Sequence, residues 1–575
     1  MEIVLAERRR ASVPPQADHR QKAPSRGLCV SGMVHNLLQG STGRQLGSHT
    51  SIRGTVPCPP AKVLHPPARP QVETRATMTA PLQAPSPSAS SRPSTYPSEA
   101  ARNSAFLEGV AQEQERFEVE VEGQVPRWLN GFYVRNGPGM FKGMTHLFDG
   151  YGMLVKFEFQ DGHVYSSQRF VESKAWQYFK QHGKPGFGEF GTPLPPLRGI
   201  FTILKGMLGL GQGFTDNSSV SVRATHNGTE LVAMTESVLG TYRVDPDTLR
   251  TRGQVVYKDN VKGDLTTAHP VTLPNGDLIN LTSAFGGQYT VFRQAANSHV
   301  RQKIAEVPLS QSPTPSWIHT FPVTKNYAVV PEMPILFNLK AAAVGGGEYV
   351  MFDWKPELGT KWHVVPLDGD TTKIRTFTSP ACFTFHIINA FESADGNNII
   401  FDFADFHDPA FLNQLHLASM RSNSGQISIA PYTRCTIPLN GSEAKFETLM
   451  KDDTAYCMCE LPNINPVYKL REYRYAYGLA GKRPTPYGNA LAKFDVKLGE
   501  TKLWHEPGAI PIEPYFVARP GAAEEDDGVV MCPVAGADGN TFLVVLDGQS
   551  FEEVARAKLP YGVPFGFHAC YVDRN

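Results

Sequence analysis

Short apolar runs separated by polar turn residues dominate the chain from about residue 106 onward. Typical runs rich in β-branched and aromatic residues are 231–234, 327–330, 398–403 and 541–546. Gly, Pro, Asn and Asp gather between such runs, as in the turns 274–277, 395–397 and 537–540. Two longer segments, 200–210 and 408–422, are the candidate helices. Because long helices do not alternate with the strands, the pattern predicts an all-β fold with mostly antiparallel strands.

A seven-bladed β-propeller fits the length of this region best. One four-stranded blade takes about 40 to 50 residues before insertions, so residues 101–575 accommodate seven blades in a single domain. The few helices are then short insertions, which we expect to cap one face. No repeat motif such as a Trp-Asp signature marks the blades, so a double-sheet jelly roll stays open as an alternative.

The first hundred residues have a different composition from the rest. They contain 12 Lys and Arg against 5 Asp and Glu, 14 of the 46 prolines, and no Phe or Trp. Such a segment cannot assemble a core. Arg8, Arg9 and Arg10 precede a Ser-rich, acid-poor tract, which is typical of an organelle transit peptide. We therefore expect 1–100 to be a disordered plastid transit peptide and a Ser/Pro linker, rather than only a disordered tail, with folded protein beginning near Phe106.

Charge and cysteine content exclude several classes of protein. Lys and Arg total 55, as do Asp and Glu, so there is no basic excess of the kind that nucleic-acid binding requires. No apolar stretch reaches the roughly 18 residues of a membrane-spanning helix. Eight cysteines in 575 residues are too few for a disulfide scaffold and indicate a reducing compartment. The sequence predicts no oligomeric state.

Four of the 17 histidines lie in apolar, β-like surroundings, unlike the others. They are His269, His319, His386 and His568, with separations of 50, 67 and 182 residues. These separations exclude a helical pair but suit inner strands of different blades that converge on one axis. Neutral imidazole is a ligand for iron, zinc, copper and nickel. Each histidine alone is more often a satisfied core residue than a ligand, but four together favour an axial metal site.

Three glutamates also occupy apolar segments. They are Glu236, Glu460 and Glu513. Metal-bound histidines usually donate their second ring N–H to a carboxylate or a carbonyl, which fixes the tautomer. We expect these glutamates to accept such hydrogen bonds from the ligating rings, although a solvated carboxylate on an edge strand is about as common for any one of them.

Ordered motifs resemble those of the carotenoid cleavage dioxygenase family over roughly residues 121 to 575. The matching segments are 129–139, 146–150, 268–270 and 524–528. The resemblance implies a seven-bladed propeller whose axial Fe(II) is held by four histidines, here His269, His319, His386 and His568. It also implies that Glu236, Glu460 and Glu513 orient these ligands. Within the family, segments 146–151, 330–334 and 550–562 look most like those of the plant plastid carlactone synthases.

The resemblance further implies an activity. Enzymes of this family cleave a polyene double bond with O2 and give carbonyl products, and no catalytic residue is needed beyond the metal centre. A protein similar to the carlactone synthases would act on 9-cis and possibly all-trans apo-10'-carotenal, in a pathway of the strigolactone-precursor type in the plastid. Three other functions stay open: a general carotenoid or stilbene cleavage dioxygenase, a non-cleaving retinoid isomerase, and a non-catalytic propeller that acts as a binding module.

Strand alternation suggests which side chains line the substrate cavity. Residues two positions from a ligand point to the same face of a regular strand. Around His319 and His386 this rule selects Trp317, Phe321, Thr384 and Ile388, with packing between blades as the alternative.

The candidate helix 200–210 is apolar apart from Lys205. A polyene substrate resides in a bilayer, and moving it through water costs about 0.8 kcal/mol per CH2 group. We expect this segment to touch the membrane peripherally through Ile200, Phe201, Leu204 and Leu208. The alternative, that its apolar face packs on the propeller, is about as common.

Overall fold

The computed structural model describes residues 95–207, 215–425, 427–450 and 458–574. The chain divides into two units, Met1–Pro87 and Ser88–Asn575, and all the described residues belong to the second. The transit peptide and linker therefore lie almost entirely outside the described residues and stay a prediction. Within the described part of the chain, no helix is long and apolar enough to cross a membrane.

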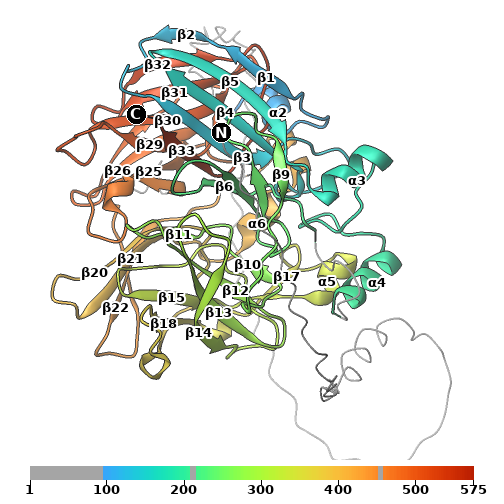
Figure 1. The fold of residues 1–575 in the computed structure, drawn as a ribbon, viewed down its shortest axis with the longest axis vertical. Coiled ribbons are helices and arrows are strands. Elements are labelled where there is room, and N and C mark those ends of the chain that lie inside the picture. The colour runs from blue at the N-terminus through green and yellow to red at the C-terminus, as the bar shows by residue number, and fades with distance from the viewer. Residues whose placement is uncertain (1–94, 208–214, 426, 451–457, 575) are drawn as a thin grey trace, which may run out of the picture. The chain divides into compact units, whose positions relative to one another are not determined.

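Seven antiparallel sheets form the blades of a propeller, as the sequence predicts (Figure 1). Blades 2, 5 and 6 are simple four-stranded sheets. Their strands are β6 (Ser221–Ala224), β7 (Leu231–Met234), β8 (Tyr242–Val244) and β9 (Thr251–Gln254) in blade 2; β20 (Ile387–Glu392), β21 (Asn398–Ala404), β22 (Tyr432–Pro438) and β23 (Lys445–Thr448) in blade 5; and β24 (Glu460–Ile464), β25 (Tyr475–Ala480), β26 (Ala490–Asp495) and β27 (Glu500–Trp504) in blade 6.

Blades 3 and 4 depart from this plan. In blade 3 the innermost strand is split in two, and blade 4 has three strands, with a separate hairpin inserted in the chain between its first and second strands. Their strands are β10 (Leu265–Thr266), β11 (Val271–Thr272), β12 (Leu278–Ser283), β13 (Gln288–Gln294) and β14 (Arg301–Pro308) in blade 3; β15 (Tyr327–Glu332), β18 (Thr360–Pro366) and β19 (Arg375–Ser379) in blade 4; and β16 (Ile335–Phe337) and β17 (Phe352–Trp354) in the hairpin.

Blades 1 and 7 close the ring by exchanging strands between the two ends of the described chain. Blade 1 has the order β1-β5-β4-β3-β33, and blade 7 has the order β2-β32-β31-β30-β28, with β29 also paired to β30. Their strands are β1 (Gln114–Glu118), β2 (Glu120–Gly123), β3 (Gly131–Pro138), β4 (Gly152–Gln160), β5 (His163–Phe170), β28 (Ile510–Pro511), β29 (Tyr515–Ala518), β30 (Gly528–Ala535), β31 (Thr541–Asp547), β32 (Glu553–Lys558) and β33 (Ala569–Asp573). The pairing of Arg135 with Ala569 and of Val121 with Ala557 thus joins segments more than 430 residues apart.

The hydrophobic core lies mainly between neighbouring blades. One cluster packs Phe157 of blade 1 against Leu543 of blade 7, and another packs Trp362 of blade 4 against Phe401 of blade 5. Central strands such as β31 are buried on both faces, whereas β32, which lies next to the outermost strand β2, alternates between partly exposed and buried positions. This difference follows from the architecture, because each central strand is covered by a blade on either side.

The described helices are short insertions. They are α2 (Glu99–Ala105), α3 (Lys174–His182), α4 (Pro196–Met207), α5 (Leu339–Val344), α6 (Ala410–Gln414) and α7 (Leu417–Ser422). The predicted helix 408–422 is thus two helices, and the segment 200–210 begins earlier, at Pro196. Figure 1 shows α3, α4 and α5 together at one side of the blades.

Regular packing begins before Phe106, the predicted start of the fold. Ala101 and Ala105 in α2 are buried, and Ser98 caps the helix by accepting a hydrogen bond from the Ala101 N–H. The helix is short and contains no aromatic residue. In the sequence it therefore looks like a continuation of the Ser/Pro-rich tract before it.

Candidate metal centre and cavity

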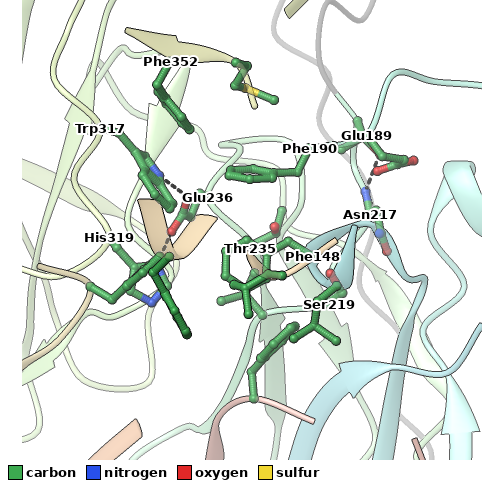
Figure 2. A pocket seen from close by; sticks show the side chains of 18 of the residues that line it. Phe148, Glu189, Phe190, Asn217, Ser219, Thr235, Glu236, Trp317, His319 and Phe352 are labelled. Atoms are coloured by element: carbon green, nitrogen blue, oxygen red, sulfur yellow. Dashed lines mark hydrogen bonds and ion pairs between the residues drawn. The ribbon is translucent and has the colours of Figure 1, made fainter. Parts of the chain in front are cut away.

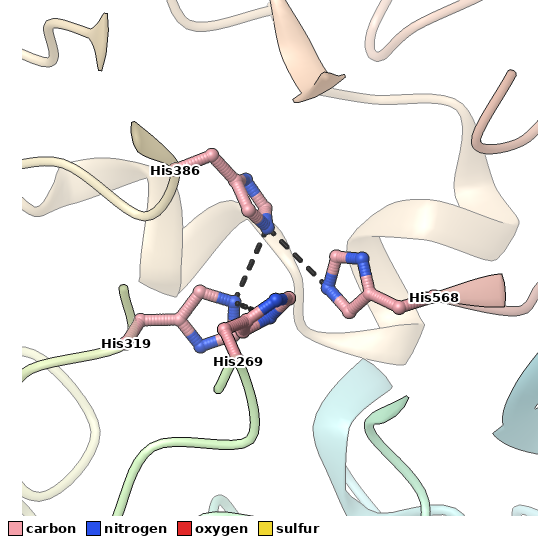
Figure 3. Close-up of side chains that lie close together, drawn as sticks. All are labelled: His269, His319, His386 and His568. Atoms are coloured by element: carbon pink, nitrogen blue, oxygen red, sulfur yellow. Dashed lines mark hydrogen bonds between the residues drawn. The ribbon is translucent and has the colours of Figure 1, made fainter. Parts of the chain in front are cut away.

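The four predicted histidines meet at one point on the propeller axis (Figure 3). The Nε2 atoms of His269 and His319 are 3.1 Å apart, those of His319 and His386 are 3.2 Å apart, and those of His386 and His568 are 3.4 Å apart. All four ligand atoms lie within 4.8 Å of one another. Nitrogens that share one ion at about 2.1 Å lie roughly 3 to 4 Å from each other, so the spacing suits a common metal ion.

Each histidine stands in irregular chain beside an innermost strand, and not within a regular strand as predicted. His269 lies in the break between β10 and β11, and His386 and His568 directly precede β20 and β33. Thr267 maintains the break: its hydroxyl accepts from the His269 N–H and donates to Asn280 Oδ1 at 2.7 Å. The break turns the His269 ring toward the axis, where a continuous strand would not place it.

Thr320 joins the segments that carry His319 and His386. Its hydroxyl donates to the Phe385 carbonyl at 2.6 Å and accepts from the Ile387 N–H at 2.8 Å. Thr320 is 7% exposed, so both hydrogen bonds are shielded from water. This one hydroxyl therefore fixes the relative position of two histidines on neighbouring blades.

A glutamate faces the outer ring nitrogen of three of the four histidines. His386 Nδ1 lies 2.6 Å from Glu460, His568 Nδ1 lies 2.8 Å from Glu513, and His319 Nδ1 contacts Glu236. Each of the three carboxylates has a further donor: Trp317 Nε1 donates to Glu236 at 2.5 Å, the Leu461 N–H donates to Glu460 at 3.3 Å, and the Ala569 N–H donates to Glu513 at 2.8 Å. Among the hydrogen bonds of the described residues, His269 has no such carboxylate partner.

Each blade supplies one residue to this arrangement. The histidines come from blades 1, 3, 4 and 5, and the glutamates come from blades 2, 6 and 7. Convergence on the axis therefore explains why the seven residues are spread over more than 300 positions of the chain.

The donor set fits a divalent transition metal. When Nδ1–H donates to a carboxylate, the Nε2 lone pair points inward, and lone pairs that share one centre repel unless a cation lies between them. Burial, followed by repulsion from neighbouring imidazoles, lowers the pKa of His269, His386 and His568 well below the usual range, so these rings are neutral and able to ligate.

Burial acts in the opposite direction on the glutamates. It raises the pKa of Glu460 to about 8 and that of Glu513 well above its usual range. A cation at the centre of the rings favours the ionised form of both carboxyl groups, because an opposite charge stabilises the charged form. Three carboxylates would then offset the charge of a metal that has only neutral ligands.

A cavity opens from the histidines into the protein, with a volume of about 210 Å³ available to the centre of a water molecule. Apolar side chains, many of them aromatic, form most of its wall, and Figure 2 shows Phe148, Phe190, Trp317 and Phe352 around it. Helices α4, α5, α6 and α7 each contribute to the lining. A long apolar molecule would find both a matching surface and exclusion from bulk water here.

Of the four residues predicted to line the cavity, the structure places one there, Trp317. Phe321 packs in the core between blades 3 and 4, Ile388 packs between blades 5 and 6, and the Thr384 hydroxyl donates to the His386 carbonyl. The alternation rule is wrong at these positions because His319 and His386 stand in irregular chain. Phe385, the immediate neighbour of His386, lines the cavity instead.

Other lining residues had weaker signals in the sequence. Phe148 belongs to the segment 146–150, and its only signal in the sequence is the resemblance of this segment to a family motif. Glu189 and Phe190 lie between glycines in the loop before α4, which reads as an ordinary surface turn. The sequence showed no feature that would distinguish these residues before the loop is placed against the propeller.

The predicted membrane segment is only partly described. Ile200 is half-buried and Phe201 is 58% exposed on α4, and Leu197, one turn earlier, is 86% exposed. Nothing is described of the Leu204 side chain, and Leu208 lies outside the described residues. Gly199 and Thr202 of the same helix line the cavity, so α4 has one side at the cavity wall and exposed apolar residues elsewhere.

Comparison with known proteins identifies relatives over most of the chain. Residues 107–573 match the family described as retinal pigment epithelial membrane protein. The carotenoid cleavage dioxygenase 8 homolog B, chloroplastic, of Oryza sativa subsp. japonica is 38% identical over 478 residues, which cover 80% of this chain and 84% of the relative. The carotenoid cleavage dioxygenase 8, chloroplastic, of Arabidopsis thaliana is 38% identical over 491 residues, which cover 81% and 85%.

Solved structures agree with this result. A cobalt-substituted apocarotenoid oxygenase of Synechocystis superposes with a TM-score of 0.69 at 25% identity, over 83% of this chain and 99% of that one.

Proposed function

Because this chain belongs to the family of carotenoid cleavage dioxygenases, we propose that it is an Fe(II)-dependent dioxygenase that cleaves one double bond of an apocarotenoid. The reaction consumes one O2, breaks one carbon–carbon double bond, and leaves one oxygen atom on each of two carbonyl products. The observation that carries the proposal is the convergence of four histidines and three glutamates, one from each blade, at the wall of an aromatic cavity.

The residues of the site have separate tasks in this reaction. His269, His319, His386 and His568 would hold the iron, which supplies the activation of O2. Glu236, Glu460 and Glu513 keep Nδ1 protonated and orient three of the rings. Trp317 both fixes Glu236 and forms part of the cavity wall.

The substrate that we propose is an apo-10'-carotenal, in the 9-cis form and with possible use of the all-trans form, in a pathway that makes strigolactone precursors. The support is the identity of 35% to 38% with three plant carotenoid cleavage dioxygenases 8, over 80% to 81% of this chain. All three relatives are named chloroplastic, which supports the plastid as the location of this protein.

We propose that the substrate enters from a membrane surface beside α4. This helix presents Leu197 and Phe201 at the surface and contributes Gly199 and Thr202 to the cavity wall. A polyene that moves from the bilayer along α4 would reach the cavity without crossing bulk water.

Loss of one ligand tests the proposal. His386→Ala should lower bound iron and abolish cleavage of 9-cis apo-10'-carotenal, because the remaining ligands leave an open, weakly held site. His163→Ala is the matched control, since His163 is an exposed residue of β5 with an ion pair to Glu118. Equal iron content and cleavage in the two variants would refute the assignment of the metal centre.

A further inference from the structure

A cluster of polar side chains interrupts the aromatic wall of the cavity away from the histidines. It consists of Glu189, Thr215, Asn217 and Ser219, all of which line the cavity. Figure 2 shows Glu189 and Asn217 on the opposite side of the view from His319, with Phe148 and Phe190 between them. A polyene held against the metal centre could therefore reach this cluster with one end.

Glu189 is the ionisable member of the cluster, and it is only 5% exposed. Among the described residues, the Thr215 hydroxyl donates to Oε1 at 3.1 Å, and the Asn217 side chain also forms a hydrogen bond with the carboxyl group. The loop that carries Glu189 is held by its own backbone, because the Glu189 N–H donates to the Thr192 carbonyl at 3.0 Å. The carboxyl group is thus fixed at the cavity surface.

Two neighbouring carboxylates are better supplied with donors than Glu189. Asp149 accepts from the N–H groups of His146 and Gly191 and from the Thr192 hydroxyl, at 2.6 to 2.9 Å. Asp216 accepts from two N–H groups at the start of α3 and from the Tyr242 hydroxyl. Both are fully buried, and each accepts at least three hydrogen bonds.

Glu189 has the fewest donors of these three carboxyl groups and is therefore the one best placed to hold a proton. Burial, together with repulsion from Asp149 and Asp216, raises the pKa of Glu189 well above its usual range. A neutral carboxylic acid has an O–H group to donate, in contrast to a carboxylate, which only accepts.

We propose that Glu189, as a neutral acid, donates a hydrogen bond to the terminal carbonyl oxygen of the apocarotenal and so selects substrates that have an oxygen at one end. The inference rests on the proposed function and adds a specificity-determining residue to it. Thr215 and Asn217 hold the acid in place, and the aromatic rings between Glu189 and the histidines contact the polyene.

This arrangement discriminates against hydrocarbons of the same length. A carotene has no acceptor, so its binding would leave the Glu189 O–H buried without a partner. An unpaired buried donor costs about 1 to 3 kcal/mol, and 1.4 kcal/mol corresponds to a tenfold change in affinity.

The test compares two substitutions and two polyenes. Glu189→Leu removes the donor, whereas Glu189→Gln keeps a neutral side chain with N–H groups that donate. The probes are all-trans apo-10'-carotenal and the matched hydrocarbon in which a methyl group replaces the aldehyde. Glu189→Leu should raise KM for the aldehyde about tenfold with kcat changed less than about twofold, and Glu189→Gln should restore KM. For the hydrocarbon, Glu189→Leu should lower KM, because no buried donor is then left without a partner.

Binding is also measured directly, through quenching of the protein's tryptophan fluorescence by the polyene, so that the result does not depend on cleavage. If the wild-type protein cleaves neither probe but still binds the aldehyde more tightly than the hydrocarbon, and Glu189→Leu removes that preference, then the proposed function fails and the inference about Glu189 stands. Equal loss of affinity for both polyenes in Glu189→Leu, or no loss for either, would overturn the inference. Unchanged thermal unfolding and iron content show that the variants are folded.

Discussion

Replacing Thr320 with valine should weaken the link between two of the segments that carry metal ligands. The side chains have nearly the same shape, so the substitution removes the hydroxyl and leaves the packing in place. The Phe385 carbonyl then loses its donor at 2.6 Å, and the Ile387 N–H loses its acceptor at 2.8 Å.

The expected size of the effect follows from burial. Each buried polar group left without a partner costs about 1 to 3 kcal/mol, so the two groups together should lower the free energy of unfolding by about 2 to 6 kcal/mol. The positions of His319 and His386 also become less well fixed relative to each other. Loss of a partner that orients ligands typically lowers metal affinity by about 10- to 100-fold, and we expect the lower end of that range here because both ring–carboxylate hydrogen bonds remain.

Urea unfolding of the metal-free protein and anaerobic iron titration measure the two effects. Thr378→Val is the matched control, because Thr378 is exposed on β19 and its replacement should change stability by less than about 0.5 kcal/mol. The reasoning would be refuted if Thr320→Val behaved like this control in both measurements. A loss of stability with unchanged iron affinity would show that the hydroxyl supports the blades but not the ligands.

Three further predictions follow from other parts of the structure. Glu236→Gln should lower iron affinity by about 10- to 100-fold in the same titration, because His319 and Trp317 face different oxygens of Glu236 and an amide turns its NH2 group toward one of these donors; unchanged affinity would contradict the role of Glu236. Leu197→Glu combined with Phe201→Glu should abolish co-sedimentation with liposomes while cleavage of detergent-solubilised substrate continues, and retained co-sedimentation would place the membrane contact elsewhere. Burial raises the pKa of Asp405 to about 6, so the folded state holds this proton more tightly than the unfolded chain, whose Asp has a pKa of about 3.9. The free energy of unfolding should therefore fall as the pH rises between these values, and Asp405→Asn should remove that fall in urea unfolding at successive pH values; an identical pH profile in the variant would refute the assignment.

The sequence predicted the four histidines of the candidate metal centre because histidines in apolar segments are rare enough to stand out. His386 in Phe-Thr-Phe-His-Ile-Ile and His568 in Phe-Gly-Phe-His-Ala-Cys carry this signal within six residues. The propeller followed from the recurrence of short strands and turns over a known length, and the structure confirms it. Both inferences rest on local sequence patterns, which can be recognised without knowing the long-range contacts.

The cavity lining required information that a local pattern does not hold. The alternation rule assumes a regular strand, and at Phe321, Thr384 and Ile388 the breaks in the chain beside the ligands made it wrong. Glu189 is a second example. In the sequence its loop looks like a polar surface turn, because Asp149 and Asp216, which lie beside Glu189 in the fold, belong to other segments of the chain. Pairing of β33 with β3, which closes the ring, likewise depends on contacts between the ends of the described chain.

Cleavage under oxygen-18 gas tests the central claim most directly. The iron-loaded protein is mixed with 9-cis apo-10'-carotenal, and the carbonyl products are trapped by immediate reduction, so that exchange with water does not erase the label, before mass spectrometry. The account predicts two products, each with one oxygen-18 atom, in an amount that rises with the iron bound at the four histidines. Recovery of the intact polyene, or of products whose new oxygen comes from water, would contradict it.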